Sequence, residues 1–143
     1  EKVYLGIVAG EVAEEAGVAI IEIQQNSDIT YRLFDYGRPR ELHLEAGMAV
    51  ASGAPFDPAT YRRLPESGDA ALVDGPYFTL DRVDGLPGEG LAARYPGSLL
   101  VIPRRGAVQV AGGTVCPGEC ALAPDLAAVS FAADGECLIA RAC

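Results

Sequence analysis

The sequence has no tryptophan, one histidine, one methionine and one lysine, and basic side chains are scarce overall. Lysine and arginine number 11 against 20 acidic residues, which gives a formal net charge of −9. A general nucleic-acid surface or an anionic-membrane surface needs a net basic face, so we expect neither partner. Runs of roughly 20 uncharged apolar residues, the length that crosses a bilayer, are also missing, so we expect no membrane-spanning helix.

Cysteine is also infrequent, and its spacing is irregular. The four cysteines, at 116, 120, 137 and 143, match neither a paired CxxC zinc pattern nor a dense secreted framework. We expect reduced thiols. Because Cys116 and Cys120 flank a Pro-Gly turn, a structural metal or a disulfide that involves the two C-terminal thiols stays an alternative.

The chain is long enough, at 143 residues, to bury a core. Its first residues, Glu1-Lys-Val-Tyr4, include neither an initiator methionine nor the basic and apolar regions of a signal peptide. We therefore expect that the true N-terminus lies upstream of Glu1.

Short apolar stretches rich in Val, Ile, Leu and Tyr recur between Gly, Pro and Asp, whereas helical periodicity is scarce. The pattern predicts a mostly β protein with one or two short helices, at Leu44–Val50 and at Pro58–Leu64, where Asp57 can cap the helix. Strands are predicted near Val3–Val8, Val18–Gln25, Ile29–Phe34, Tyr77–Val83, Leu99–Ile102, Ala107–Val110, Cys120–Ala123, Ala127–Phe131 and Cys137–Arg141.

One continuous segment carries the most specific signal. It runs from Ile21 to Glu45 and reads IEIQQNSDITYRLFDYGRPRELHLE. The core from Glu22 to Arg38 mixes charged, amide and aromatic residues without a break, and it resembles the signature of bacterial type I phosphomannose isomerases, which are cupins. Lys2–Gly6 and Pro76–Arg82 resemble two further strands of that family.

The resemblance implies a cupin-type jelly-roll β-sandwich. It assigns residues 1–50 to part of the catalytic cupin unit, 51–76 to a linker and 77–143 to a C-terminal cupin-like β unit. In this last unit the turn Pro117-Gly118 is not followed by the histidine of a cupin metal motif. We expect no catalytic metal there.

The resemblance also implies the roles of individual side chains. Arg32 is expected to line the active site as a catalytic residue, because a guanidinium can hold an anionic oxygen with two parallel hydrogen bonds; the alternative is a salt bridge to Asp28 or Glu22. Glu22, Asp28 and Arg38 are expected to bind substrate, although Glu22 could equally make a structural hydrogen bond. For Arg38 the expectation comes from the Gly-Arg-Pro-Arg loop that it shares with Arg40, where both could attract phosphate; the alternative is that they are solvated, as loop arginines usually are. His43 is expected to pack or to cap a helix.

The family's metal ligands do not appear in this sequence. The family binds a divalent metal, usually zinc, through a Gln-x-His element, a glutamate and a further histidine, and that last position falls near Val12 here. Lys2–Gly6 also stands too close to the signature. Either a segment is missing near Val12–Ala16, or a natural deletion has removed catalysis. We therefore expect that residues 8–17 do not form an ordinary tight connection.

The leading interpretation is a cytoplasmic isomerase that interconverts mannose 6-phosphate and fructose 6-phosphate through an enediol, with zinc held by residues outside this sequence. The alternative is a non-catalytic cupin that binds a sugar or a sugar phosphate. In both cases the partner is a small carbohydrate ligand, and the sequence carries no signal for an oligomeric state.

Overall fold

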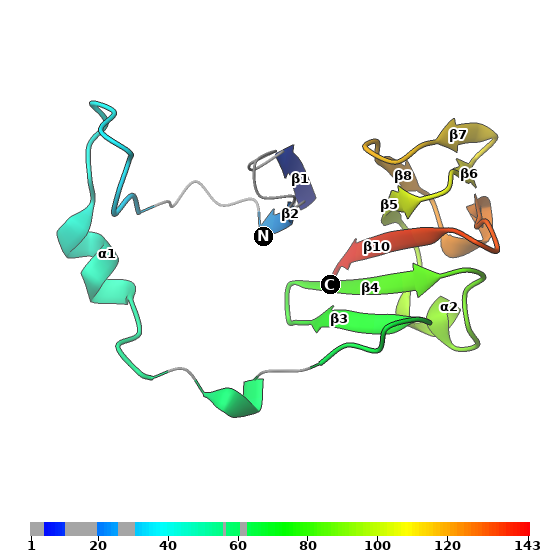
Figure 1. The fold of residues 1–143 in the computed structure, drawn as a ribbon, viewed down its shortest axis with the longest axis horizontal. Coiled ribbons are helices and arrows are strands. Elements are labelled where there is room, and N and C mark those ends of the chain that lie inside the picture. Colours follow the sequence, from blue (N-terminus) through cyan, green and yellow to red (C-terminus); the bar gives the residue numbers. More distant parts are fainter. Residues whose placement is uncertain (1–4, 11–19, 26–30, 56, 61–62) are drawn as a thin grey trace. The chain divides into compact units, whose positions relative to one another are not determined.

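A computed structural model describes residues 5–10, 20–25, 31–55, 57–60 and 63–143 of the chain. Most of the regular structure in these ranges is antiparallel β, arranged in three sheets (Figure 1). The first is a hairpin in which β1 (Leu5–Gly10) pairs with β2 (Ile20–Gln25). The predicted mostly β fold class is confirmed, and the antiparallel sheets with two short α-helices fit a cupin-like β fold.

The second sheet has five strands in the order β3-β4-β10-β5-β8. Its last strand in sequence, β10, lies between β4 and β5, and Ile139 faces Asp81 on one side and Val101 on the other. The bounds are β3 (Ala70–Asp74), β4 (Phe78–Asp84), β5 (Leu99–Arg105), β8 (Ala121–Ala123) and β10 (Glu136–Ala142). A four-residue helix, α2 (Leu91–Arg94), lies between β4 and β5 in the sequence.

The third sheet is small and has the order β7-β6-β9. Its strands are β6 (Val108–Val110), β7 (Gly113–Val115) and β9 (Val129–Ser130), and β9 follows the 3₁₀ helix η2 (Leu126–Ala128). Ala111 and Gly112, between β6 and β7, both have positive φ, at 48° and 86°. Two consecutive positive φ angles are typical of the type I′ turn that joins paired strands.

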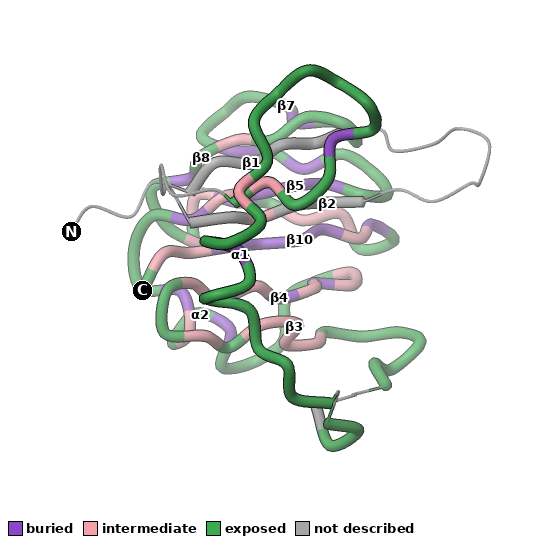
Figure 2. Tube along the Cα trace, turned by 90° about the vertical axis from the view of Figure 1, so that its left-hand side faces the viewer, coloured by how far each residue is buried: buried purple, intermediate pink, exposed green. Residues whose placement is uncertain are grey.

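The described hydrophobic core lies between Val83 and Ile139. Alternate residues of β4 are buried, and β5 and β10 contribute longer buried runs (Figure 2). The side chain of Tyr95 is 2% exposed, and its hydroxyl donates a 3.0 Å hydrogen bond to the backbone oxygen of Ile139. The buried cluster comprises Val83, Leu91, Tyr95, Leu99, Val101, Val108, Val110, Val115, Ala123, Val129, Cys137 and Ile139.

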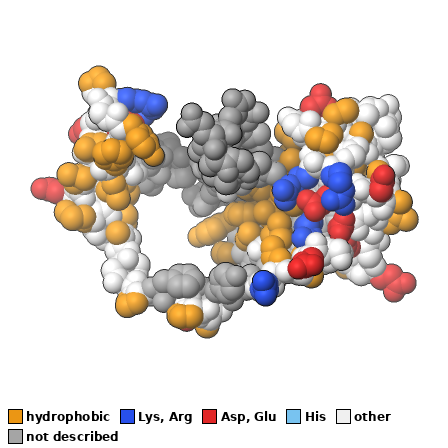
Figure 3. Space-filling view, viewed as in Figure 1, with side chains coloured by type: hydrophobic (Ala, Val, Ile, Leu, Met, Phe, Trp, Pro, Cys, Tyr) orange, Lys and Arg blue, Asp and Glu red, His pale blue; other side chains and the backbone are white. Residues whose placement is uncertain are grey.

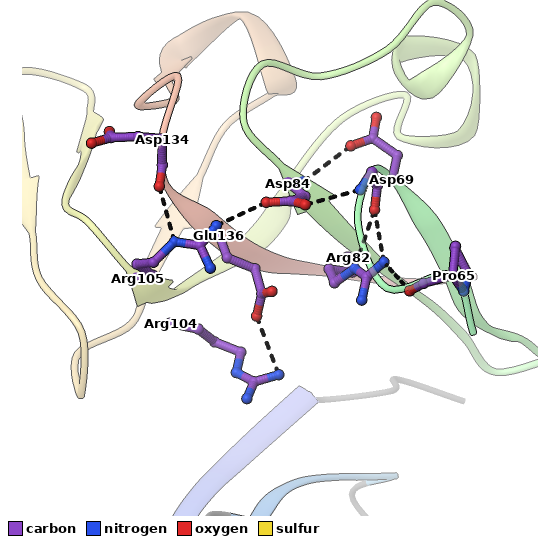
Figure 4. Close-up of polar contacts among 9 residues, drawn as sticks. Pro65, Asp69, Arg82, Asp84, Arg104, Arg105, Asp134 and Glu136 are labelled. Carbon is purple, nitrogen blue, oxygen red and sulfur yellow. Dashed lines mark hydrogen bonds and ion pairs between the residues drawn. The ribbon is translucent and has the colours of Figure 1, made fainter. Parts of the chain in front are cut away.

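Charged side chains fix one end of the five-stranded sheet (Figure 4). Asp84 accepts hydrogen bonds from the Gly68 amide at 2.9 Å and from Arg105 at 2.9 Å, while the Asp69 carboxylate accepts from the Asp84 amide at 3.1 Å. The backbone hydrogen bond from Gly68, reinforced by Arg105, lowers the pKa of Asp84 in spite of partial burial. Arg82 donates to the Pro65 oxygen at 2.8 Å. These contacts attach residues 65–69 to β4, and Arg105 attaches β5 to the same carboxylate.

Two short α-helices are present in the described ranges, and one was predicted. α1 spans Leu44–Val50, as predicted. Pro58–Thr60 is a 3₁₀ helix, η1, and not the start of an α-helix that reaches Leu64. The predicted cap is confirmed, because the Asp57 carboxylate accepts a 2.9 Å hydrogen bond from the Ala59 amide. No helix in the described part of the chain combines the length and the apolar character that crossing a membrane would require.

The predicted strand over Ile29–Phe34 is wrong where it can be compared. Residues 31–34 are not a strand, and residues 29–30 lie outside the described residues. The backbone of Arg32 bonds to His43 instead of joining a ladder. The strands β3 and β7 were not predicted.

Residues 8–17 were predicted not to form an ordinary tight connection between neighbouring strands. β1 and β2 are antiparallel neighbours, with Gly10 opposite Ile20. The connection between them therefore joins two adjacent strands. Residues 11–19, which include the predicted gap at Val12–Ala16, lie outside the described residues.

The residues group into two compact units, Asn26–Arg63 and the remainder of the chain. In the described part of Asn26–Arg63, large apolar side chains are exposed, and Figure 3 shows them gathered around α1. They are Tyr31, Leu33, Phe34, Tyr36, Leu42, Leu44, Met48 and Val50.

Candidate functional site around Arg32

A tight turn organises the segment that contains the predicted site residues. The Arg38 amide donates a 2.9 Å hydrogen bond to the Asp35 backbone oxygen, which closes a four-residue reversal. Its two central residues, Tyr36 and Gly37, have φ angles of 50° and 76°. Such a turn favours glycine at its second central position, because the missing Cβ removes the steric penalty of positive φ. The turn brings Arg40 back toward Asp35.

Asp35 and Arg40 form a bidentate ion pair. Arg40 Nε donates to one carboxylate oxygen of Asp35 at 2.6 Å, and an amino group of Arg40 donates to the other oxygen. Asp35 is buried, with 6% of its surface exposed. The hydrogen bonds from Arg40 lower the pKa of Asp35, against the opposing effect of burial, and the positive charge of Arg32 adds a smaller contribution. Arg40 is therefore neutralised within the segment.

Arg32 is held through its backbone and through its side chain. Its amide donates a 3.0 Å hydrogen bond to His43 Nδ1, and its carbonyl accepts a 2.7 Å hydrogen bond from the His43 amide. One guanidinium nitrogen donates to the Glu41 backbone oxygen at 3.1 Å. Among the described residues, Arg32 has no ion pair. Its guanidinium is anchored by a neutral carbonyl and keeps further N–H donors for an anion.

His43 connects Arg32 to α1. It occupies the N-cap position of the helix, and its carbonyl accepts a 2.8 Å hydrogen bond from the Gly47 amide. Its side chain does not cap the helix, because Nδ1 accepts from the Arg32 amide. The imidazole also makes an edge contact with Tyr31, with ring centroids 6.3 Å apart. The capping alternative for the side chain was therefore wrong, and the packing alternative is confirmed by the contact with Tyr31.

The structure locates only some of the predicted site residues. Arg32 and Arg38 lie in the same described segment, and the Arg38 side chain has no hydrogen bond or ion pair among the described residues. Glu22 lies on β2, where the structure describes only the backbone, and Asp28 lies outside the described residues. The roles of all four residues stay predictions.

Sequence reasoning missed Asp35 and the pairing of Arg40. The available signal was an aspartate five residues before an arginine, with Tyr-Gly between them. A Tyr-Gly turn that brings the two side chains together is one of several conformations open to such a loop. The spacing alone therefore did not select the pair.

The described residues do not fit the zinc ion that the resemblance implies. No three His, Cys, Asp or Glu side chains in the described ranges gather closely enough to hold a metal ion. The one histidine already uses Nδ1 as an acceptor. Burial raises the pKa of the Cys137 thiol to about 12, which disfavours the thiolate that binds metals.

The C-terminal residues contain a shallow cavity of about 330 Å³ between β3, β4 and α2. Its arginine, Arg94, donates to Asp81 at 3.0 and 3.2 Å, and Asp81 is 2% exposed. The ion pair raises the pKa of Arg94. Asp81 already neutralises the Arg94 guanidinium. This cavity is therefore a weaker candidate for binding an anion than the surroundings of Arg32 are.

Curated relatives resemble part of this chain. It is 37% identical over 73 residues to a probable mannose-6-phosphate isomerase, GmuF, of Bacillus subtilis strain 168, and 40% identical over 73 residues to the mannose-6-phosphate isomerase of Streptococcus mutans serotype c. The chain contains a phosphomannose isomerase-like region. Each of these alignments covers 45% of this chain and 23% of the relative.

A shorter stretch of the chain is more similar still. Over 40 residues it is 50% identical to the mannose-6-phosphate isomerase ManA of Bacillus subtilis strain 168, which is 24% of this chain and 13% of that relative. The chain thus matches less than a quarter of the length of these relatives. No protein-family model matches the chain.

Proposed function

We propose that this chain is part of a mannose-6-phosphate isomerase and that Arg32 holds an anionic oxygen of the sugar phosphate. One structural observation carries the proposal: among the described residues, Arg32 has no carboxylate partner, whereas Arg40 in the same segment is neutralised by Asp35. The relatives that match the region bear the name of this isomerase.

The reaction moves a proton between two neighbouring sugar carbons. A base removes the proton from C2 of mannose 6-phosphate while the C1 carbonyl oxygen gains a proton, which gives the enediol. Loss of the proton on the C2 oxygen and protonation of C1 then give fructose 6-phosphate. Negative charge develops on the oxygens, and a preorganised guanidinium lowers the energy of that state more than it lowers the energy of the substrate.

The other predicted substrate contacts belong to the same proposal. Arg38 would attract the phosphate, because its side chain has no partner among the described residues. Glu22 and Asp28 would bind the sugar hydroxyls. The zinc that the resemblance implies would be held by residues outside this sequence, and no step above is assigned to it.

An isomerase assay of the intact protein that contains this chain, on mannose 6-phosphate with and without added zinc, tests the proposal. We expect Arg32→Ala to lower kcat/KM about a hundredfold or more, as loss of a preorganised charge-stabilising donor does. Arg32→Lys should restore only part of the rate, because an ammonium lacks the planar fork. Arg104→Ala, which removes an exposed arginine paired with Glu136, is the matched control. An unchanged rate in folded Arg32→Ala would remove Arg32 from the site.

A second candidate is a sugar-phosphate-binding protein without isomerase activity. The observation in its favour is that the described residues contain no metal-holding group. Binding of mannose 6-phosphate by the intact protein that contains this chain, with no turnover in the presence of zinc, would select this candidate.

A further inference from the structure

We propose that His43 is a positioning residue, which keeps the Arg32 guanidinium in a fixed place for the substrate oxygen. This inference rests on the proposed function of Arg32. It concerns a residue for which the sequence predicted only packing or helix capping.

The first step of the argument is the geometry between the two residues. Arg32 and His43 are eleven positions apart and are joined by two hydrogen bonds, from the Arg32 amide to His43 Nδ1 at 3.0 Å and from the His43 amide to the Arg32 oxygen at 2.7 Å. Both backbone polar groups of Arg32 are therefore satisfied by one residue. Residues 31–34 are not in a strand, so the Arg32 amide has no partner in a strand ladder. Its partner is the His43 side chain instead.

The second step is that His43 is itself fixed by the helix. Its carbonyl accepts the hydrogen bond from the Gly47 amide that begins α1. The imidazole packs edge-on against Tyr31, the neighbour of Arg32. The position of Arg32 is thus tied to a regular element and not only to its own loop.

The third step concerns the side chain of Arg32. Its guanidinium donates to the backbone oxygen of Glu41, two residues before His43. The same short stretch, Glu41 to His43, therefore holds both ends of Arg32. Catalysis by a positioned hydrogen-bond donor needs the donor to be held in a fixed place, because a misplacement of about 1 Å can lower the rate about a hundredfold.

The hydrogen bond makes a chemical demand on the imidazole. Nδ1 can accept from the Arg32 amide only if it carries no proton, so the neutral ring must carry its proton on Nε2. A side-chain amide oxygen can take the place of Nδ1. We therefore expect His43→Asn to keep the contact and His43→Ala to lose it.

The first test is nuclear magnetic resonance on the ¹⁵N-labelled wild-type chain. We expect the Nε2–H form of His43 and a scalar coupling across the hydrogen bond between the Arg32 amide nitrogen and Nδ1. The Nδ1–H form would overturn the inference. This measurement needs no substrate and no variant.

The second test is a double-mutant cycle on mannose 6-phosphate binding, measured by titration calorimetry. His43→Ala should weaken binding about tenfold, the worth of one such hydrogen bond, and should have no further effect in the Arg32→Ala background. His43→Asn should bind nearly as the wild type does. Met48→Ala, an exposed residue of α1, is the matched control.

The outcomes separate the two proposals. If the intact wild-type protein that contains this chain binds no mannose 6-phosphate, the proposed function fails, and with it the purpose assigned to His43. If the wild type binds, but the effects of His43→Ala and Arg32→Ala are additive, or His43→Asn is as weak as His43→Ala, the positioning inference alone is overturned.

Discussion

Arg38 and Arg40 stand two residues apart in one loop, yet only Arg40 has a carboxylate partner among the described residues. The difference comes from the turn at Tyr36 and Gly37, which returns Arg40 to Asp35. The sequence presents both as loop arginines and cannot separate them. Arg32, in contrast, is singled out by its place in a long unbroken stretch of family resemblance, and its role stays a prediction.

The Asp35–Arg40 pair makes a testable prediction about acid. The hydrogen bonds from Arg40 hold the pKa of Asp35 below its ordinary value of 3.8. At a pH above the ordinary pKa of aspartate, the ionised pair therefore stabilises the folded segment fully. This stabilisation is lost as the pH falls through the lowered pKa. We expect the Asp35 carboxyl carbon to titrate below pH 3.8 in a nuclear magnetic resonance experiment.

Two variants check the cause of this shift. Arg40→Gln should return the midpoint of Asp35 toward its ordinary value, because the largest lowering contribution comes from the Arg40 hydrogen bonds. Arg38→Gln removes an equal charge from the same loop, but Arg38 bonds to Asp35 only through its backbone amide. This variant should therefore leave the titration midpoint of Asp35 nearly unchanged. Equal effects of the two variants would contradict the assignment.

At the scale of the elements, sequence patterns predicted all of the described strands except β3 and β7. β4, β5 and β10 have seven residues each, with apolar runs or alternation long enough to recognise. β7 has three residues, and its Gly113 reads as part of a turn. Residues 31–34 show the opposite error, since β-favouring side chains are present but the backbone of Arg32 bonds to His43.

The loops that end the strands depend on glycines with positive φ, and two of them allow a matched comparison. Gly85 follows β4, has a φ of 81°, and an added Cβ would lie 2.9 Å from the Ala133 backbone oxygen. Gly112, in the turn between β6 and β7, has a φ of 86° and no heavy atom within 4 Å of such a Cβ. At both positions a side chain would meet the conformational cost of positive φ. Only at Gly85 would it also clash with backbone atoms.

We expect Gly112→Ala to reduce the free energy of unfolding by about 1 kcal/mol, the cost of left-handed backbone for an L-residue. Gly85→Ala should cost at least about 1 kcal/mol more, because backbone atoms and not a flexible side chain must move. Urea unfolding followed by circular dichroism measures both. Equal losses would mean that the Gly85 loop can shift away from Ala133 at no cost.

At the scale of the whole molecule, the described buried core lies between Val83 and Ile139, whereas the described part of Asn26–Arg63 exposes most of its large apolar side chains. The predicted division into residues 1–50, 51–76 and 77–143 stays a prediction. β3, at residues 70–74, nevertheless pairs with β4 and completes the edge of the five-stranded sheet. The contacts of Pro65, Gly68 and Asp69 extend this anchorage back toward residue 65.

These contacts set the smallest piece that we expect to fold. A fragment of residues 64–143 contains the described core, both larger sheets and the charged network of Asp84 (Figure 4). It should unfold in one cooperative transition, as small single domains do. A fragment that starts at Tyr77 lacks β3 and the loop that bonds to Arg82 and Asp84, and it should be clearly less stable.

Variants of the 64–143 fragment make the prediction quantitative. Ile139→Ala removes a fully buried side chain at the centre of the sheet and should cost about 2–5 kcal/mol. Leu86→Ala, at a position that is 66% exposed, is the matched control and should change stability by less than about 0.5 kcal/mol. Thermal and urea unfolding would measure all of these proteins. A fragment that shows no cooperative transition would mean that residues outside 64–143 are needed to complete the core, and equal losses for Ile139→Ala and Leu86→Ala would place the core elsewhere.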